Sequence, residues 1–456
     1  ALADTLLSKQ WQYDAVGEMI QKRDQRYGTV SYDYDPTGRI EQAMGSGLPS
    51  EVFRWDAAAN LVSSDHPGGY IEHNRLKMFE DKRFEYDAYG RLVRKLSGRG
   101  PAKELALEYD DWHQLKTVVT KDRLGISTTH FEYDAFGRRI RKRNGGYAST
   151  DFLWDGMRLV QETYHDRSGE EALTYLYEPN SYVPLARIDQ GAQAANDADA
   201  RNTVYYFHND VSGLPEELTD TDGELVWQAR YKVWGNAVQE EWIERVPQRP
   251  PPSWSEAQAA ASTLAHTPRP QNLRFQGQYL DRETGLHYNT FRFYDPDVGR
   301  FITRDPIGLY GGENLYRYAA NPLMWADPLG WAPHQATMTV YAPDGTMRFT
   351  EALKSGGATG TSWPEQIASH TESKGIIDPR IQSGDRVVFT DATLPPCSGC
   401  RGNMNVAAAS KNLTVEYHWA DGKGQSGSWF TDADKGAKAV ARRNARKGLG
   451  SSGCSR

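Results

Sequence analysis

The last quarter of the sequence contains four side chains whose types and order fit hydrolytic metal chemistry. His370 and Glu372 stand two residues apart, and a Cys-x-x-Cys pair, Cys397 and Cys400, begins 25 residues after Glu372. One imidazole and two thiolates supply three ligands of a tetrahedral zinc ion and leave the fourth position for water. Such a water loses its proton near neutral pH, and a carboxylate such as Glu372 can take it. These residues predict a hydrolytic Zn²⁺ site.

The elements around these residues must bring them together. Pro395 and Pro396 precede Cys397 and favour a helix start there, whose amino end would help to hold both cysteines as thiolates. We expect strands at 338–342, 347–350, 385–391 and 413–419, and a helix at 431–447. Strands that alternate with helices over about 125 residues predict a small α/β domain.

A second pair of chemically capable residues lies upstream. Two Asp-Pro-x-Gly elements stand 22 residues apart, at Asp305 and Asp327. Two carboxylates that lie close together can share one proton, so that one acts as general base and the other as general acid. The spacing shows only that both aspartates follow similar turns, and capping those turns is the alternative role.

A repeated pattern, aromatic-Asp-x-x-Gly-Arg, runs through the first third of the chain. Its copies begin at Trp11, Tyr32, Phe84 and Phe131, with weaker copies at Trp55, Tyr109 and Trp154. Alternating aromatic and charged residues predict a strand, Asp and Gly a turn, and the residues after Arg a return strand. One hairpin cannot bury its own face, so we expect the units to stack side by side into a long sheet. Unrelated hairpins with common turn residues are the alternative.

Two segments interrupt this pattern. Residues 236–270 contain Pro-Gln-Arg-Pro-Pro-Pro and an alanine-rich stretch, which indicate an extended loop or short helix inserted between repeats. Residues 190–202 are polar and alanine-rich, and we expect an exposed loop there.

Composition and charge narrow the class of protein. The 42 glycines, 25 tyrosines and 13 tryptophans are typical of a turn-rich β protein. The three cysteines all lie in the last 60 residues, which argues against a disulfide framework for the body. Residues 332–456 carry 15 Lys and Arg against 11 Asp and Glu, a net charge of +4 in a chain of −7, which fits a tail that meets nucleic acid. We expect no membrane-spanning helix and no signal peptide, and a chain that is a fragment of something longer.

The repeats resemble the YD repeats of Rhs and Tc-toxin proteins over residues 11–331. Four further segments support the resemblance: 205–215, 275–281, 284–289 and 292–302. The resemblance implies a mostly antiparallel spiral β-sheet at 1–331 that closes as a hollow shell around a toxin, followed by a small α/β domain at 332–456.

The block from Arg304 to Trp331 resembles the segment with which an Rhs shell cuts off its own carboxy-terminal cargo. The resemblance implies a self-cleaving aspartyl protease segment at about 275–331, with Asp305 and Asp327 as catalytic pair and Arg292 as supporting residue. Cleavage is expected between Trp331 and Ala332. The family usually has leucine where this chain has Trp331.

The His-x-Glu and Pro-Cys-x-x-Cys motifs resemble the signature of zinc nucleoside and nucleobase deaminases. This implies a cytidine-deaminase-like fold, zinc on His370, Cys397 and Cys400, and Glu372 as proton shuttle. Cytosine-to-uracil conversion in DNA is the expected reaction, with RNA or adenine as alternatives. Candidate stacking aromatics, most of them expected in the core, are Trp363, Phe389, Tyr417, Trp419, Trp429 and Phe430.

Other hypotheses stay open at this stage. A zinc-stabilised binding or nuclease module without deamination would need a fourth protein ligand, with Cys454 and His418 as candidates. A third hypothesis, a structural adhesin with an inert tail, gives no role to the His-x-Glu and Cys-x-x-Cys motifs. The Rhs resemblance implies an interbacterial toxin made in the producer cytoplasm and delivered by contact, by the type VI route, into a target cytoplasm. It also implies an immunity protein, and a secretion spike or chaperone that meets a missing N-terminal part.

Overall fold

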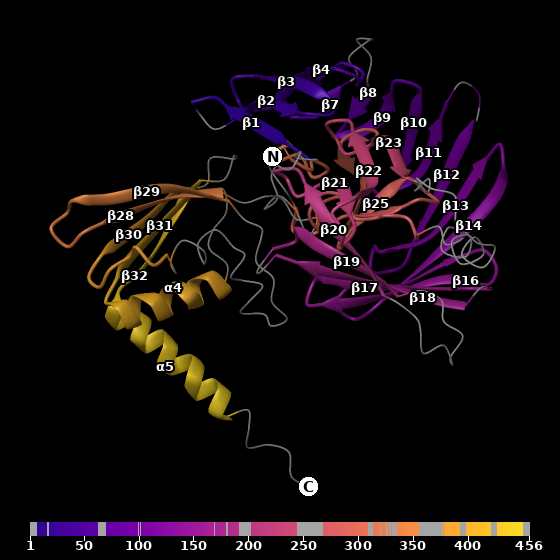
Figure 1. Cartoon of the computed structure of the whole chain (residues 1–456). Helices are drawn as coiled ribbons and strands as arrows, with labels where there is room; N and C mark the ends of the chain where they lie inside the picture. Colours follow the sequence, from indigo (N-terminus) through magenta and orange to yellow (C-terminus); the bar gives the residue numbers. More distant parts are fainter. Residues whose placement is uncertain are drawn as a thin grey trace, which may run out of the picture.

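The computed structural model describes residues 7–15, 18–62, 70–98, 100, 102–167, 169–178, 181–190, 202–243, 268–308, 313–319, 321–324, 327, 330, 335–354, 376, 378–392, 398–420 and 426–449. These residues form five β-sheets and two α-helices (Figure 1). Neither helix has the length and apolar character that crossing a membrane requires.

The largest sheet has sixteen strands, hydrogen-bonded in strict sequence order from β8 to β23. Its strands are β8 Tyr70–Glu72, β9 Arg75–Phe79, β10 Lys82–Tyr86, β11 Leu92–Ser97, β12 Lys103–Tyr109, β13 Leu115–Asp122, β14 Gly125–Tyr133, β15 Arg139–Asn144, β16 Ala148–Asp155, β17 Arg158–Asp166, β18 Gly169–Tyr177, β19 Pro184–Gln190, β20 Thr203–Asn209, β21 Pro215–Thr219, β22 Leu225–Tyr231 and β23 Ala237–Trp242. The expected stacking of antiparallel hairpins into one long sheet is confirmed.

Three smaller sheets accompany it. The first contains β1 Lys9–Tyr13, β2 Met19–Asp24, β3 Gly28–Tyr34, β4 Ile40–Gly45 and β5 Glu51–Val52. The second pairs β6 Arg54–Trp55 with β7 Leu61–Val62. The third contains β24 Tyr279–Asp281, β25 Leu286–Asn289, β26 Arg292–Asp295 and β27 Arg300–Phe301.

The expected interruption at 236–270 begins too early. β23 covers Ala237–Trp242 and pairs in register with β22. This strand is solvent-exposed on one face, and its charged residues interrupt the apolar alternation that predicts a strand. The rest of the expected insertion, 244–267, and residues 191–201 of the other expected loop lie outside the described residues.

Each repeat turn is held by its own aspartate. Between β10 and β11, Asp87 Oδ1 accepts hydrogen bonds from the backbone N–H groups of Tyr89 and Arg91, both at 2.9 Å. The Arg91 Nε donates to the other carboxylate oxygen at 2.7 Å. Gly90 sits in the left-handed region at φ +80°. The weaker repeat at Tyr109 keeps this geometry with His113, at φ +64°, in the glycine position, at a cost of about 1–2 kcal/mol.

Neighbouring repeats are joined by side chain to backbone hydrogen bonds. The tyrosine before each turn aspartate reaches back to the previous return strand: Tyr109 Oη donates to the Leu92 carbonyl at 2.8 Å, and Tyr133 Oη to the Leu115 carbonyl at 2.7 Å. The motif arginine reaches forward, since Arg138 Nη1 donates to the Gly156 carbonyl at 2.6 Å. The repeat is thus a unit for binding its neighbours as well as for turning the chain.

The described residues between 268 and 330, here called the core segment, lie on the concave side of the long sheet (Figure 1). Apolar side chains of both pack in one cluster. Buried ion pairs fix their relative position. Lys95 on β11 contacts Asp295 at 2.7 Å and Asp297 at 2.8 Å, and Lys142 on β15 contacts Asp281 at 3.4 Å. Burial opposes the charge of Lys95, but the two aspartates outweigh it and raise its pKa above 10.5.

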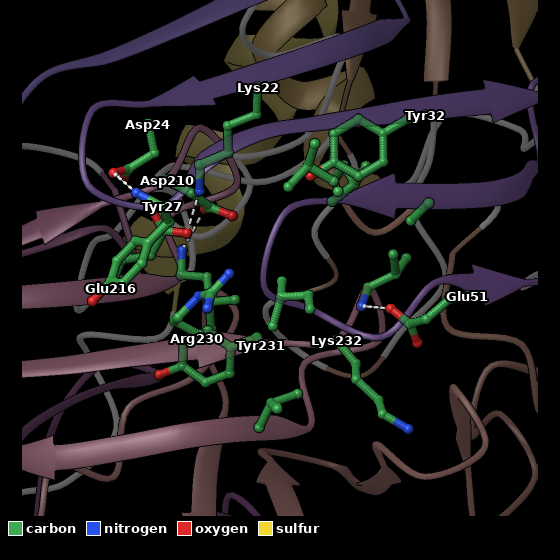
Figure 2. A pocket seen from close by; sticks show the side chains of 18 of the residues that line it. Lys22, Asp24, Tyr27, Tyr32, Glu51, Asp210, Glu216, Arg230, Tyr231 and Lys232 are labelled. Atoms are coloured by element: carbon green, nitrogen blue, oxygen red, sulfur yellow. Dashed lines mark hydrogen bonds and ion pairs between the residues drawn. The ribbon is translucent and has the colours of Figure 1, made fainter.

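A second set of ion pairs joins β1 and β2 to β21. Lys9 contacts Glu216 at 2.7 Å. Lys22 also contacts Glu216, beside a cavity of about 90 Å³ between these sheets (Figure 2). Burial opposes the ionisation of Glu216, but Lys22 and Lys9 lower its pKa to about 2. Because this pKa is depressed from 4.5, the pairs stabilise the fold above that pH, and the contribution is lost as pH falls toward 2.

The carboxy-terminal sheet has the strand order β29-β28-β30-β31-β32. Its elements are β28 Gln335–Tyr341, β29 Met347–Lys354, β30 Arg386–Ala392, α4 Ser398–Lys411, β31 Thr414–Ala420, β32 Ser426–Thr431 and α5 Ala433–Leu449. β30 and β31 are parallel, with α4 as the crossover between them. Side chains from α4 and from strands β28, β30 and β31 form one core. The four expected strands and the final helix are present, while β32 was not predicted.

Replacing Lys95 by Met tests the buried ion pairs. The change leaves Asp295 and Asp297 without their buried cation, so we expect the free energy of unfolding to fall by about 3–5 kcal/mol. Arg143→Met is the matched control, since Arg143 pairs with Glu132 but is half-exposed, and a loss of about 0–1 kcal/mol is expected. Urea unfolding followed by tryptophan fluorescence measures both. Equal losses in the two variants would contradict the assignment.

Candidate functional sites

The structure brings the three residues Arg292, Asp305 and Asp327 together. Arg292 Nη2 lies 3.0 Å from Asp305 Oδ2 and 3.3 Å from Asp327 Oδ2. All three side chains are buried, with exposed fractions of 2%, 6% and 2% for Arg292, Asp305 and Asp327. The spacing of the two Asp-Pro-x-Gly elements could not establish this proximity, which depends on β26 supplying the arginine.

Asp305 is both a turn residue and a member of this cluster. Its Oδ1 accepts a hydrogen bond from the Ile307 backbone N–H at 3.0 Å, and its backbone N–H donates to the Leu315 carbonyl at 2.8 Å. Its Oδ2 is the oxygen that contacts Arg292. Turn capping therefore uses one carboxylate oxygen and aims the other at the guanidinium.

Arg292 is enclosed on several sides. Its guanidinium carbon lies 3.5 Å from the centre of the Phe301 ring. Its Nη1 donates to the Leu315 carbonyl at 3.2 Å, and its Nε donates to the Gly330 carbonyl. Burial lowers the pKa of Arg292 below 12.5, although Asp305 and Asp327 act in the opposite direction. A guanidinium stays protonated at neutral pH even so, which makes Arg292 a fixed positive charge between two carboxylates.

Two further residues of this site were missed by the sequence analysis. The Asn289 side-chain amide donates to the Asp327 carbonyl at 2.8 Å. Gly330 lies at φ +69°, and a Cβ there would be 2.7 Å from the Asn289 carbonyl oxygen. The Asp-Pro-x-Gly motif gave a signal for the glycine, whereas Asn289 was marked only as the last residue of segment 284–289, with no role assigned.

Of the residues expected in the metal site, only part can be described. Cys400 lies in the first turn of α4, which begins at Ser398, directly after Cys397. The predicted helix start at the Cys-x-x-Cys pair therefore agrees with the structure. His370, Glu372 and Cys397 lie outside the described residues, as do Trp331 and Ala332 of the expected cleavage site. In the part of the chain that is described, no three His, Cys, Asp or Glu side chains are grouped so as to hold a metal ion.

The aromatic candidates divide between core and surface. Phe389 and Tyr417 are fully buried in the core of the carboxy-terminal sheet, with ring centres 5.6 Å apart. Phe430 on β32 is 42% exposed, and Lys435 Nζ of α5 lies 4.1 Å from its ring centre. Trp429 is partly buried against the core. Of the described aromatics, Phe430 is therefore the one best placed to meet a ligand from solvent.

His418 lies on the opposite side of the sheet from α4. On β31 the side chains of Val415 and Tyr417 join the core that includes residues of α4. Successive side chains on a strand point to opposite faces. His418 accordingly is half-exposed, and its Nε2 lies 3.6 Å from Glu416 Oε2. This position is unfavourable for a ligand to a metal held at the start of α4.

Replacing Arg292 by Met tests whether the guanidinium compensates both buried carboxylates. We expect the free energy of unfolding to fall by about 3–5 kcal/mol, because two buried negative charges lose their cation. Adding Asp305→Asn and Asp327→Asn removes those charges and should recover part of the loss. Denaturant midpoints of the single and triple variants measure this. A triple variant that is no more stable than Arg292→Met would contradict the compensation.

Family models match three parts of the chain. Residues 109–149 match the RHS Repeat family and residues 204–241 the RHS protein family. Residues 329–438 match a Pput2613-like deaminase family.

Two curated relatives match about 70% of this chain at moderate sequence identity. Double-stranded DNA deaminase toxin A of Burkholderia cenocepacia is 41% identical over 345 residues, which are 72% of this chain and 22% of that protein. Toxin protein Tse5 of Pseudomonas aeruginosa is 29% identical over 381 residues, 70% of this chain and 26% of the relative. The chain thus spans about a quarter of the length of these relatives. A solved TcdB2-TccC3-TEV structure matches 71% of this chain and 18% of its own chain at 16% identity, with a TM-score of 0.43.

Proposed function

We propose that this chain, an Rhs repeat protein that carries a Pput2613-like deaminase domain, is a toxin whose carboxy-terminal domain deaminates a nucleobase after the chain has cut itself. The domain boundary of the proposal lies between 1–331 and 332–456. The observation that carries the deaminase assignment is the family match at 329–438, which contains both the His-x-Glu and the Cys-x-x-Cys motifs.

Three residues would hold zinc in this proposal: His370, Cys397 and Cys400. The donor set fits the metal, and the start of α4 at Ser398 supports it because the positive end of a helix favours thiolates. When bound, zinc supplies an acidified water near neutral pH. Glu372 accepts a proton from water, passes it to the ring nitrogen of the base, and a further proton leaves with ammonia.

A purely structural zinc is the weaker alternative. It needs a fourth protein ligand, and His418 lies on the sheet face away from α4. Cys454, the other candidate, lies outside the described residues. The geometry of β31 therefore argues against His418 as the fourth ligand.

Cytosine in DNA is the proposed substrate; the name of the 41% identical relative, a double-stranded DNA deaminase toxin, supports DNA as the polymer, and the resemblance of the two motifs to zinc deaminases is the ground for proposing the base. The repeats alone do not select it, since another repeat-bearing relative, from Dickeya dadantii, is named a probable deoxyribonuclease. Phe430 pairs with Glu416 across β31 and β32 and so lies on the sheet face away from α4, and the proposal assigns it no stacking role. RNA as the polymer and adenine as the base are the alternatives, and the deamination assay described next tests both.

Glu372→Ala should remove deamination and leave zinc bound, because the carboxylate moves protons and is not a ligand. Purified 332–456 is incubated with single- and double-stranded DNA and RNA, and sequencing reports C-to-U and A-to-I changes. Zinc content is measured alongside. Glu416→Gln, which removes a half-exposed carboxylate paired with Arg386, is the matched control and should stay active. Unchanged deamination by Glu372→Ala would refute the assignment.

Self-cleavage is the second part of the proposal, supported by the Asp305–Arg292–Asp327 cluster. One carboxylate takes a proton from a water molecule while the oxygen of that water bonds to the Trp331 carbonyl carbon. The C–N bond to Ala332 then breaks, and the other carboxyl gives a proton to the leaving amine. The Arg292 contact with the Gly330 carbonyl ties the chain next to this bond to the two aspartates.

Asp305→Asn should leave the chain uncut, because an amide can neither accept nor supply the required proton. A denaturing gel of the freshly produced full chain then shows one band, where the unchanged chain shows two, of about 331 and 125 residues. Asp344→Asn, an exposed turn aspartate, is the control and should be cut normally. Two bands from Asp305→Asn would sink the protease assignment.

Delivery and partners complete the proposal. The toxin would be made in the producer cytoplasm, pass by contact-dependent type VI secretion into a target cell, and be neutralised by an immunity protein. A secretion spike or chaperone would bind sequence beyond this chain. Support comes from two relatives that are named toxins and are about three times as long. Killing that persists when producer and target cells are separated by a filter would contradict it.

A further inference from the structure

One hairpin of the core segment presents two buried polar side chains at its tip. Asn289, at the end of β25, and Arg292, at the start of β26, are paired in register. Their exposed fractions are 0% and 2%. Thr290 in the turn between them adopts φ +50°, which is uncommon for a β-branched residue. The hairpin thus fixes the positions of both side chains relative to each other.

These two side chains hold opposite ends of the Asp327–Gly330 turn. The Asn289 amide donates to the carbonyl of Asp327 at 2.8 Å, and Arg292 Nε donates to the carbonyl of Gly330. Within the turn, the Gly330 N–H donates to the Asp327 carbonyl at 3.3 Å. Gly330 also packs so closely that a Cβ would lie 2.7 Å from the Asn289 carbonyl oxygen.

We infer that Asn289 is a positioning residue for self-cleavage, and this inference rests on the cleavage proposed above. Asn289 acts through the backbone of Asp327. By holding that carbonyl, it sets where the Asp327 carboxylate stands relative to Arg292 and Asp305, and where the chain leaves Gly330 toward the bond that is cut. Its contribution is geometric, and it exchanges no proton.

The hydrogen bonding of Asn289 supports this role over simple packing. Its Oδ1 is buried and has no hydrogen-bond partner within the described part of the chain. A buried amide with one unsatisfied group costs stability. Its N–H donor to Asp327 is thus the feature that an apolar residue of similar size would not supply.

Asn289→Ala in the full chain tests the role, with cleavage followed over time after pulse-labelled cell-free synthesis. We expect the rate to fall about 10²-fold, the effect of misplacing a reacting group by about 1 Å. Asn272→Ala is the matched control. Asn272 is a buried asparagine of the same segment, but it donates to Tyr164 and Tyr279 at 2.9 and 3.0 Å. It should be cut at the normal rate.

Two further measurements separate positioning from loss of stability. Thermal midpoints are compared in an Asp305→Asn background, where every chain stays whole, and the two alanine variants should lose similar stability. Asn289→Asp keeps the side-chain shape but can donate only when its carboxyl is protonated. This carboxyl stands beside Arg292, Asp305 and Asp327. We expect the cleavage rate of Asn289→Asp to rise as pH falls, and to rise more than the rate of the unchanged chain.

The outcomes are distinct. Normal cleavage by Asn289→Ala, with Asp305→Asn uncut, overturns the inference and leaves self-cleavage standing. Equal slowing by Asn289→Ala and Asn272→Ala also overturns it, because that result reflects general loss of structure. Cleavage of Asp305→Asn defeats the proposed protease itself.

Discussion

The rest of the shell depends on one constraint: lysines on the inner face of the sheets each need a carboxylate partner. Lys22, Lys95 and Lys142 occupy equivalent positions, each four residues after the last residue of its turn motif. Each points to the inner face and meets a carboxylate from a distant part of the chain, such as Glu216 or Asp295. A buried charge without its partner is expensive. Through Lys95 and Lys142 the core segment is therefore held in one position against the sheet, whereas an apolar face would tolerate sliding.

That single position brings three charged side chains together at the end of the core segment. Arg292 comes from β26, Asp305 and Asp327 from the turns that follow, and all three meet because β24 to β27 are fixed against the long sheet. One guanidinium binds both carboxylates and the Gly330 carbonyl at once. Several fixed N–H donors on one planar group suit arginine and not lysine, which has a single point of charge.

The features that could be predicted are local in sequence. The turn motif contains its own aspartate, glycine and arginine within five residues, so the hairpins and their order in the sheet followed from the pattern. The sequence predicts a loop where strand β23 lies, because the residues of β23 show no regular apolar alternation. The approach of Asp305 to Asp327, and the role of Asn289, depend on contacts between segments more than twenty residues apart. Residue type and spacing carry no information about such contacts. The Cys-x-x-Cys pair at a helix start could be predicted because residue type and spacing define it within one short motif.

The pairing of Lys95 and Lys142 has a consequence for how many hairpins the shell can contain. β11 and β15 stand four strands apart, roughly 19 Å at 4.8 Å per strand. Their lysines reach Asp295 and Asp281, which lie at the ends of β26 and β24 of one small sheet. A hairpin inserted between β11 and β15 would separate the lysines by a further ~10 Å while the aspartates stayed in place. Repeat number in that interval is thus constrained by the distance between two aspartates of the core segment.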